Sequence, residues 1–237
     1  MASKIFDRTP EVVLAVYAHP DDADVACGAS LAKWCDAGAE VHLVLLTDGG
    51  KGTIDSSMRP GDLAALRQAE VADASSVLGI KAVEHLDIPD GDVAEQAWLI
   101  EALVERIRRL RPDVVLGHDP TAVFFGSVYV NHRDHRAAGW ALLDAVAPAS
   151  GLPHYYPSAG PPHRVGDVLL SGTLDPDAFV EVAASIERKV AAVTAHKTQL
   201  PDDPAWAAAT IRGRAEEAGR MIGVAAAEGF RHLELDG

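Results

Sequence analysis

Short apolar runs alternate with longer amphipathic segments along most of the chain. The apolar runs are almost uninterrupted, as is typical of strands buried on both faces of a sheet, and they span Val12–Tyr17, Val41–Thr47, Ala82–Leu86, Val114–Gly117 and Val168–Leu170. The amphipathic segments predict helices over Ala23–Gly38, Leu63–Leu78, Asp92–Leu110, His132–Val146, Pro176–Thr198 and Trp206–Glu228. This alternation predicts an α/β fold in which helices cover both faces of a mostly parallel sheet.

The C-terminal half interrupts the alternation with one long irregular segment. Closely spaced prolines predict a loop over Pro148–Gly166, which could cover a site. Near the end of the chain, Phe230–Leu235 is expected to form an edge strand.

Polar residues follow three of the predicted strands at the point where each strand ends. The first run is followed by AHPDD at 18–22, the second by TDGG at 47–50 and the fourth by GHDP at 117–120. The carboxyl ends of parallel strands lie along one edge of a sheet, and ligands bind at that edge in folds of this kind. We therefore expect these polar groups to converge on one site.

The first of these stretches combines a rigid turn with groups suited to metal chemistry. Pro20, which has no N–H and a fixed φ, stands between His19 and the carboxylates of Asp21 and Asp22. His19 and Asp22 have the side chains of metal ligands, and Asp21 can act as a base. The alternative is that the acidic residues only cap the following helix, a position that Asp favours.

A second stretch, NHRDHR at 131–136, adds two imidazoles. His132 and His135 are three residues apart and can share one face of a helix. Together with His19 and Asp22 they offer a ligand set suited to catalytic zinc with an open position for water. The alternative is that both histidines belong to a solvated helix start.

Composition narrows the class of protein. The composition, 48% hydrophobic and 24% charged, is ordinary for a globular protein. A length of 237 residues allows one domain with a large core, although length alone leaves two small domains open. The formal net charge of −14 argues against nucleic acid or an anionic membrane surface as the main partner. Cys27 and Cys35 suggest no disulfide framework. Because we expect neither a signal peptide nor a membrane-spanning segment, the cytoplasm is the expected compartment.

These motifs resemble those of the LmbE-like, or PIG-L-type, N-acetylglucosaminyl deacetylases. The resemblance is carried by AHPDDAD at 18–24, TDG at 47–49, RQAE at 67–70, HDP at 118–120, NHRDH at 131–135 and HKTQ at 196–199. It implies a Rossmann-like fold in a single domain over residues 1–237, with the active site at the carboxyl ends of the strands. It further implies one zinc ion per chain and a small-molecule N-acylated amino sugar as substrate, and it leaves homo-oligomer formation open.

The resemblance also implies a role for each site residue. The zinc ligands would be His19, Asp22 and His135. Asp21 looks like the general base, His132 like the group that polarises or protonates at the reacting centre, and Asp134 like the acidic residue that tunes His132. A cationic His132 would share the oxyanion with zinc and then protonate the leaving amine.

Some positions depart from the family or allow two interpretations. Val130 stands where well-studied members have a tyrosine, and Arg133 where the family often has proline. Arg67 matches a substrate-binding arginine, although it could instead pair with Glu70 on the same helix face. His196 could reach the substrate, or it could be a plain histidine at a helix end.

Loops must recognise whatever the substrate carries beyond its acyl group. The candidate segments are Lys51–Met58, Phe124–Val130 and Pro148–Pro162. Aromatic residues such as Tyr155 and Tyr156 could pack against a sugar ring, or they could simply anchor the loop.

Two other activities stay open at this point. One is hydrolysis of a different small-molecule amide, such as a thiol conjugate or an antibiotic precursor. The other is metal-dependent sugar binding without turnover, which would have no need of Asp21 as a free base.

Overall fold

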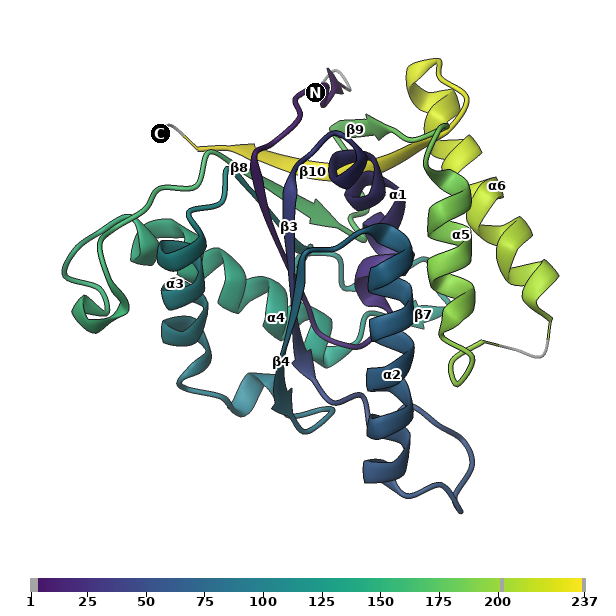
Figure 1. Ribbon diagram of the computed structural model, residues 1–237, viewed down its shortest axis with the longest axis horizontal. Helices are drawn as coiled ribbons and strands as arrows, with labels where there is room; N and C mark the ends of the chain where they lie inside the picture. The colour runs from purple at the N-terminus through teal and green to yellow at the C-terminus, as the bar shows by residue number, and fades with distance from the viewer. Residues whose placement is uncertain (1–3, 201–202, 236–237) are drawn as a thin grey trace.

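The computed structural model describes residues 4–200 and 203–235. Within these ranges, eight strands form one sheet in the order β1–β9–β10–β8–β5–β2–β3–β4 (Figure 1). Their bounds are β1 (Lys4–Ile5), β2 (Val12–Tyr17), β3 (Glu40–Thr47), β4 (Ala82–Ile88), β5 (Val114–His118), β8 (Asp167–Ser171), β9 (Ala178–Glu181) and β10 (Ala227–Glu234). β10 runs antiparallel to both of its neighbours, and the other pairs are parallel. The expected mostly parallel α/β sheet is confirmed.

Helices cover both faces of the sheet. Their bounds are α1 (Asp22–Asp36), α2 (Pro60–Leu78), α3 (Leu99–Leu110), α4 (Arg133–Asp144), α5 (Ile186–Ala195) and α6 (Pro204–Ile222). Figure 1 shows α1, α2, α5 and α6 on one face and α3 and α4 on the other. A hairpin of β6 (Phe124–Phe125) and β7 (Tyr129–Val130) stands apart from the main sheet. No helix within the described ranges has the length and apolar character needed to cross a bilayer.

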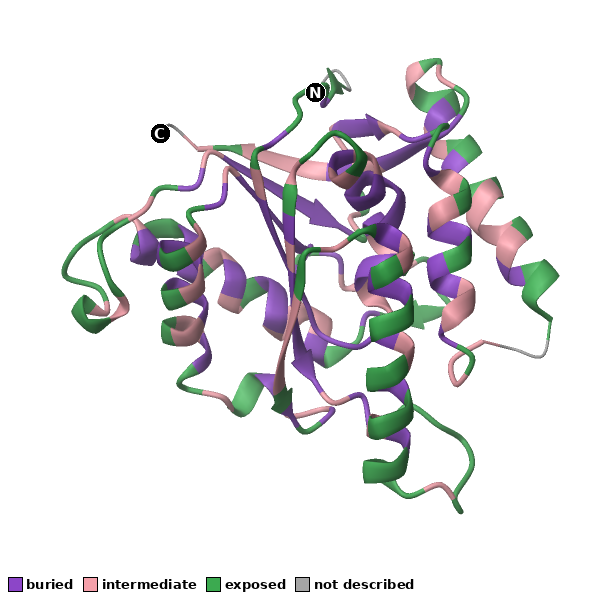
Figure 2. Ribbon diagram, viewed as in Figure 1, coloured by how far each residue is buried: buried purple, intermediate pink, exposed green. Residues whose placement is uncertain are grey.

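The central strand shows why its sequence is continuously apolar. Val13 and Ala15 of β2 belong to the core on the α1 face, whereas Leu14 and Val16 belong to the core on the α3 and α4 face. All four side chains are at most 1% exposed. Because successive residues of a strand point to opposite faces, burial on both faces requires an apolar residue at every position. Figure 2 shows the central strands buried and the outer faces of the helices exposed, whereas most of the edge strand β4 is only half-buried.

Several expected elements have different bounds, because long-range contacts compete with local periodicity. The predicted helix Asp92–Leu110 starts only at Leu99, after a 3₁₀ turn over Val93–Glu95 (η1). The backbone N–H groups of Gly91 and Val93 donate to the carboxylate of Asp134, at 2.6 and 3.3 Å, so this segment is held by α4.

The C-terminal predictions need a similar correction. The expected helix Pro176–Thr198 contains strand β9, whose first three residues are fully buried, and α5 follows it. The expected helix Trp206–Glu228 ends at Ile222, where Gly223 adopts a left-handed φ of 77°. β10 is not the expected edge strand over Phe230–Leu235, since it lies between β9 and β8.

The proline-rich loop does not lie at the expected site. The expected helix His132–Val146 ends as α4 at Asp144, and a π-helical turn over Ala145–Ser150 (η2) starts the loop, which also contains a 3₁₀ turn over Pro157–Ala159 (η3). Arg108, near the C-terminus of α3, donates to loop carbonyls of Ala149, Ser150, Leu152, Tyr155, Tyr156 and Gly160. His163 contacts the carbonyl of Pro112, just before β5, at 2.9 Å. The loop is therefore bound at the amino ends of the strands, opposite the polar carboxyl ends, and the interpretation of Tyr155 and Tyr156 as sugar-binding residues is wrong.

Candidate functional site

The turn after β2 places Asp21 in a strained conformation. Its φ of 127° and ψ of −24° lie where non-glycine residues are rare, at a cost of about 1–3 kcal/mol. The Asp21 side chain makes no capping hydrogen bond to α1, so it is not the helix cap that its position would allow. Its Oδ1 accepts from Arg67 at 3.0 Å, and no described residue donates to Oδ2. A strained carboxylate with a free oxygen is typical of a functional residue.

Next to Asp21, three donor atoms from two distant segments meet. His19 Nδ1 lies 3.1 Å from His135 Nε2 and 3.2 Å from an oxygen of Asp22, and the other oxygen of Asp22 lies 3.2 Å from His135 Nε2. A tetrahedral zinc ion with bonds of about 2.0–2.1 Å would place its ligand atoms roughly 3.3 Å apart. Two unprotonated imidazole nitrogens at this separation repel each other unless a cation lies between them. The donor set therefore fits a zinc ion.

The outer nitrogens of both rings have acceptors that orient them. His19 Nε2 lies 3.2 Å from a carboxylate oxygen of Asp90 and 3.5 Å from one of Asp134. His135 Nδ1 lies 3.0 Å from Oδ1 of Asn131, which in turn donates from its amide to the carbonyl of Ala122 at 2.8 Å. Donation from each outer N–H leaves the inner nitrogen unprotonated. Such support is characteristic of metal-binding histidines.

The carboxylates make this corner of the protein strongly attractive to positive charge. Burial opposes protonation of His19, but hydrogen bonds to Asp134, Asp22 and Asp90 outweigh it and raise the pKa of His19. Burial and the charge of Asp22 raise the pKa of Asp21 to about 6, against the opposing effect of Arg67. A bound cation would be stabilised by the same carboxylates that, without it, favour protonation of His19.

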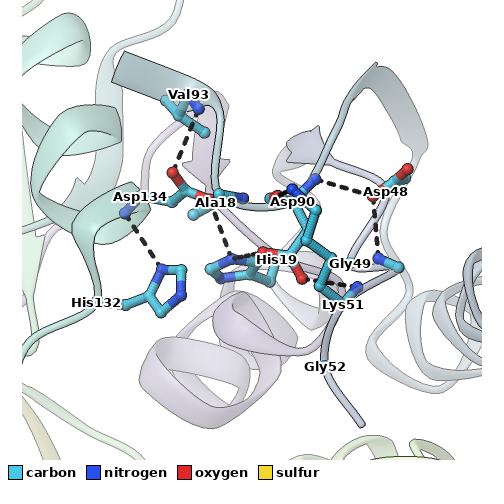
Figure 3. Close-up of polar contacts among 12 residues, drawn as sticks. Ala18, His19, Asp48, Gly49, Lys51, Gly52, Asp90, Val93, His132 and Asp134 are labelled. Atoms are coloured by element: carbon cyan, nitrogen blue, oxygen red, sulfur yellow. Dashed lines mark hydrogen bonds and ion pairs between the residues drawn. The ribbon is translucent and has the colours of Figure 1, made fainter. Parts of the chain in front are cut away.

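His132 and Asp134 stand at the start of α4, as Figure 3 shows. His132 is the N-cap residue, and its Nδ1 accepts the backbone N–H of Asp134 at 3.2 Å. Its ring packs edge-on against His19 with 4.6 Å between the centroids. Burial, together with the neighbouring imidazoles, lowers the pKa of His132. This favours a neutral ring that donates from Nε2, instead of the expected cationic ring.

The carboxylate of Asp134 does not contact His132 in the expected way. It accepts from the backbone of Gly91 and Val93 and faces His19, and only its backbone N–H reaches His132. Asp134 is completely buried. Its position couples the start of α4 to the loop after β4.

Arg67 and His196 are too buried for the substrate contacts expected of them. Arg67 is 3% exposed, and its guanidinium donates to Asp21 and to the carbonyls of Gly49 and Pro20. A β-carbon at Gly49 would lie 2.6 Å from Arg67 Nη1, so only glycine allows this close approach. The alternative pairing with Glu70 is also absent from these contacts.

His196 is 1% exposed, and its Nε2 lies 3.0 Å from the carboxylate of Asp24 on α1. Glu70 instead accepts from the backbone and hydroxyl of Thr198. The HKTQ segment therefore packs α5 against α1 and α2 and does not present His196 to the substrate.

Three residues at the site had no role assigned from the sequence. His118 at the end of β5 stacks on His135 at 4.1 Å between centroids, and its Nε2 lies 3.3 Å from Asp22. Asp90 and Asn131 orient the two histidines described above. His118 could have been found from the sequence, because it is a polar residue that directly follows a predicted strand. Asp90 also follows a strand, but this becomes apparent only when the end of β4 is placed at Ile88.

A cavity of about 590 Å³ opens beside the three donor atoms. Asp22, His118 and His135 are among its lining residues, as are Phe125 and Tyr129 of the hairpin. The hairpin, which belongs to the candidate segment Phe124–Val130, thus supplies two aromatic rings to the cavity.

Comparison with known proteins agrees with this geometry. Residues 14–146 match the family described as GlcNAc-PI de-N-acetylase, PIG-L. The chain is 35% identical over 227 residues to a diacetylchitobiose deacetylase of Thermococcus kodakarensis, covering 93% of this chain and 82% of that protein. It is 30% identical over 238 residues to a 1D-myo-inositol 2-acetamido-2-deoxy-alpha-D-glucopyranoside deacetylase of a Mycobacterium species, covering 81% and 75%. The structure of N,N'-diacetylchitobiose deacetylase from Pyrococcus horikoshii superposes with a TM-score of 0.85 at 31% identity, covering 95% of this chain and 84% of that one.

Proposed function

The chain belongs to the PIG-L family of GlcNAc-PI de-N-acetylases, and from this premise we propose that it is a zinc-dependent hydrolase of the N-acetyl amide of a small amino-sugar conjugate. The observation that carries the proposal is the mutual approach of His19 Nδ1, His135 Nε2 and the Asp22 carboxylate to 3.1–3.2 Å. Two relatives are named as deacetylases of N-acetylated amino sugars, which supports the same class of substrate here.

The metal-holding residues would be His19, Asp22 and His135. Two nitrogens and one carboxylate leave a fourth position open, as catalytic zinc sites do. The ion, when bound, supplies Lewis acidity that activates water and polarises the amide carbonyl. Asp90 and Asn131 hold the two imidazoles in the tautomers that such binding requires.

Asp21 is the general base in this proposal. Its Oδ1 is held by Arg67, which leaves Oδ2 to accept a proton from the attacking water. The protonated Asp21 then returns that proton to the amine nitrogen as the C–N bond breaks, so the products are acetate and a free amino sugar. The strained backbone at Asp21 argues against a sugar-binding protein without turnover, because metal binding alone needs no residue in that conformation.

His132 is proposed to stabilise the oxyanion. Because Nδ1 accepts the Asp134 backbone N–H, the ring proton of the neutral form lies on Nε2. That N–H can donate to the oxygen that gains charge in the tetrahedral intermediate, an effect worth about 3–4 kcal/mol for a well-placed donor. Asp134 acts as a positioning residue through its backbone N–H and through its buried carboxylate.

Release of acetate from N-acetylglucosamine conjugates tests the function. The zinc-loaded enzyme should release acetate with stoichiometric formation of a primary amine, and the Asp21→Asn variant should not. The Asp73→Asn variant is a matched control, because Asp73 lies exposed on α2 away from the site. Equal turnover by the wild type and Asp21→Asn would contradict the assignment of the base, and no release from any N-acetylated conjugate would contradict the proposed function.

A further inference from the structure

The turn over residues 47–51, TDGGK, follows β3 at the carboxyl edge of the sheet and has no part in the chemistry proposed above. A β-carbon at Gly50 would lie 2.8 Å from the carbonyl oxygen of Pro60, so the turn packs closely against the start of α2. The carbonyl of Gly52, the next residue after the turn, accepts from the side chain of Gln199 at 3.1 Å. Two separate segments of the chain therefore hold this TDGGK turn in place.

The TDGGK turn contacts three of the four polar groups of Asp90. Oδ1 of Asp48 accepts the backbone N–H of Asp90 at 3.1 Å, and it also accepts the backbone N–H of Gly50 at 2.9 Å. The backbone N–H of Lys51 donates to Oδ2 of Asp90 at 3.2 Å, and the ammonium of Lys51 donates to the Asp90 carbonyl (Figure 3). The turn thus holds Asp90 by its backbone and by its side chain.

The fourth polar group of Asp90, its Oδ1, faces a metal-holding residue. It lies 3.2 Å from Nε2 of His19. Asp90 is 6% exposed, so contacts within the protein decide how its carboxylate is turned. Rotation of the carboxylate would break the hydrogen bond from the Lys51 backbone. The orientation of the His19 ring therefore depends, through Asp90, on the TDGGK turn.

Lys51 has a second partner, whose effect must be separated from that of Asp90. The Lys51 side chain is 57% exposed, and its ammonium also lies 3.8 Å from a carboxylate oxygen of Asp92. An exposed ion pair of this kind contributes little to stability. Asp90 is buried, and the contact of its carbonyl with Lys51 fixes the backbone next to the carboxylate that faces His19. Asp90, and not Asp92, links Lys51 to the metal site.

We propose that Asp48 and Lys51 are positioning residues for the metal site, which act through Asp90 on the ring of His19. The proposal rests on the proposed function, because it takes His19 as a ligand of the zinc ion. A ring that is already turned toward Asp22 and His135 loses less conformational freedom when the ion binds. Zinc affinity should therefore depend on two residues that contribute no ligand atom.

A double-mutant cycle on zinc affinity tests the role of Lys51. The dissociation constant is measured by competition with a chromogenic chelator for the wild type, Lys51→Met, Asp90→Ala and the double variant. Asp90→Ala should weaken zinc binding about 10- to 100-fold, as loss of a direct partner of a ligand does. Lys51→Met should weaken it about two- to tenfold in the wild type, the effect of one hydrogen bond. It should have no further effect in Asp90→Ala, because the carboxylate through which Lys51 acts is then missing.

Two results of this cycle would overturn the role of Lys51. One is a loss of less than twofold for Lys51→Met in the wild-type background, and the other is the same loss in both backgrounds.

The role of Asp48 is tested by a conservative pair of variants. Asp48→Asn keeps an oxygen that accepts the N–H of Asp90 and should bind zinc nearly as well as the wild type. Asp48→Ala removes that acceptor and should weaken zinc binding about two- to tenfold. Equal losses in the two variants would show that the charge of Asp48 matters and its hydrogen bond to Asp90 does not.

Control variants separate these effects from general changes in charge and stability. Lys81→Met removes a lysine of similar exposure, 52%, whose partner Glu40 lies at the opposite edge of the sheet. Asp92→Asn removes the ion pair of Lys51 and leaves its contact with Asp90. Both should bind zinc as the wild type does. Because the assay needs no turnover, failure to bind zinc in the wild type would contradict the proposed function, whereas unchanged affinity in Lys51→Met and Asp48→Ala would refute only the positioning roles.

Discussion

Replacing Asn131 by alanine should weaken zinc binding without removing any ligand atom. Asn131 is 7% exposed, and its Oδ1 lies 3.0 Å from Nδ1 of His135. That contact fixes which nitrogen of His135 carries the proton and how the ring is turned. Loss of such a partner typically costs 10- to 100-fold in metal affinity, which is about 1.4–2.7 kcal/mol.

Asn131→Ala should also lower the free energy of unfolding of the apoprotein. The amide of Asn131 also donates to the carbonyl of Ala122 at 2.8 Å, which ties the hairpin of β6 and β7 to the start of α4. Leaving that buried carbonyl without its donor costs about 1–3 kcal/mol. The apoprotein should therefore unfold at a lower urea concentration, and zinc should restore less stability than it does in the wild type.

The assay is zinc competition with a chromogenic chelator at fixed pH. Asn131→Asp is the matched variant, since it keeps an oxygen acceptor for His135 while it loses the donor to Ala122. It should retain zinc affinity close to that of the wild type and share part of the loss in stability. A dissociation constant for Asn131→Ala within twofold of the wild type would refute the inference that His135 binds the ion through Nε2.

Three further predictions address the base, the metal and the buried histidine. Asp21→Asn should retain zinc but lose kcat by at least about 10²-fold, and loss of the metal at neutral pH would instead make Asp21 a ligand. Elemental analysis of His19→Ala and His135→Ala should show that both variants have lost most of their zinc, and full occupancy in both would contradict the site. Bound zinc should stabilise the folded wild type by about 4 kcal/mol at a free zinc concentration 1,000 times Kd. A chelator should remove that stabilisation. Burial alone would lower the pKa of His196, but the hydrogen bond and charge of Asp24 raise it above 6.5. A raised folded-state pKa stabilises the fold fully below the unfolded-state value and ceases to do so as the pH rises through the folded-state value. The difference in unfolding free energy between the wild type and His196→Gln should therefore shrink on going from about pH 6 to about pH 9, and a pH-independent difference would show that His196 stays neutral.

The amino-acid sequence by itself determined the central layers of the fold and the chemistry of the site. The unbroken apolar run at Val12–Tyr17 needs burial on both faces, and a parallel sheet covered by helices provides that burial. Strands that end in polar residues could be assigned to one edge of the sheet without knowledge of their order. His19 and Asp22 follow such a strand, whereas His135 lies on a helix, and its selection over His132 as a ligand came from the resemblance to the family. The structure brings all three side chains into contact.

Tertiary contacts decided the features for which local sequence is ambiguous. Ala178–Glu181 is a strand because it pairs with β1 and β10, which come from opposite ends of the chain. The proline-rich loop is held away from the site by Arg108, a residue whose helix periodicity says nothing about its partners. Local patterns record which residues prefer to be buried, but the partner of each buried group depends on contacts distant in sequence.

The same reason explains why the supporting residues of the site were found only in three dimensions. Arg67 has the sequence position of a substrate ligand, yet its guanidinium is used to hold Asp21 and the turn at Pro20. Asp90 follows a strand whose end was placed too early, so its contact with His19 was not foreseen. A donor or acceptor can be recognised from its residue type, but which atom it serves is set by the packing of whole elements against each other.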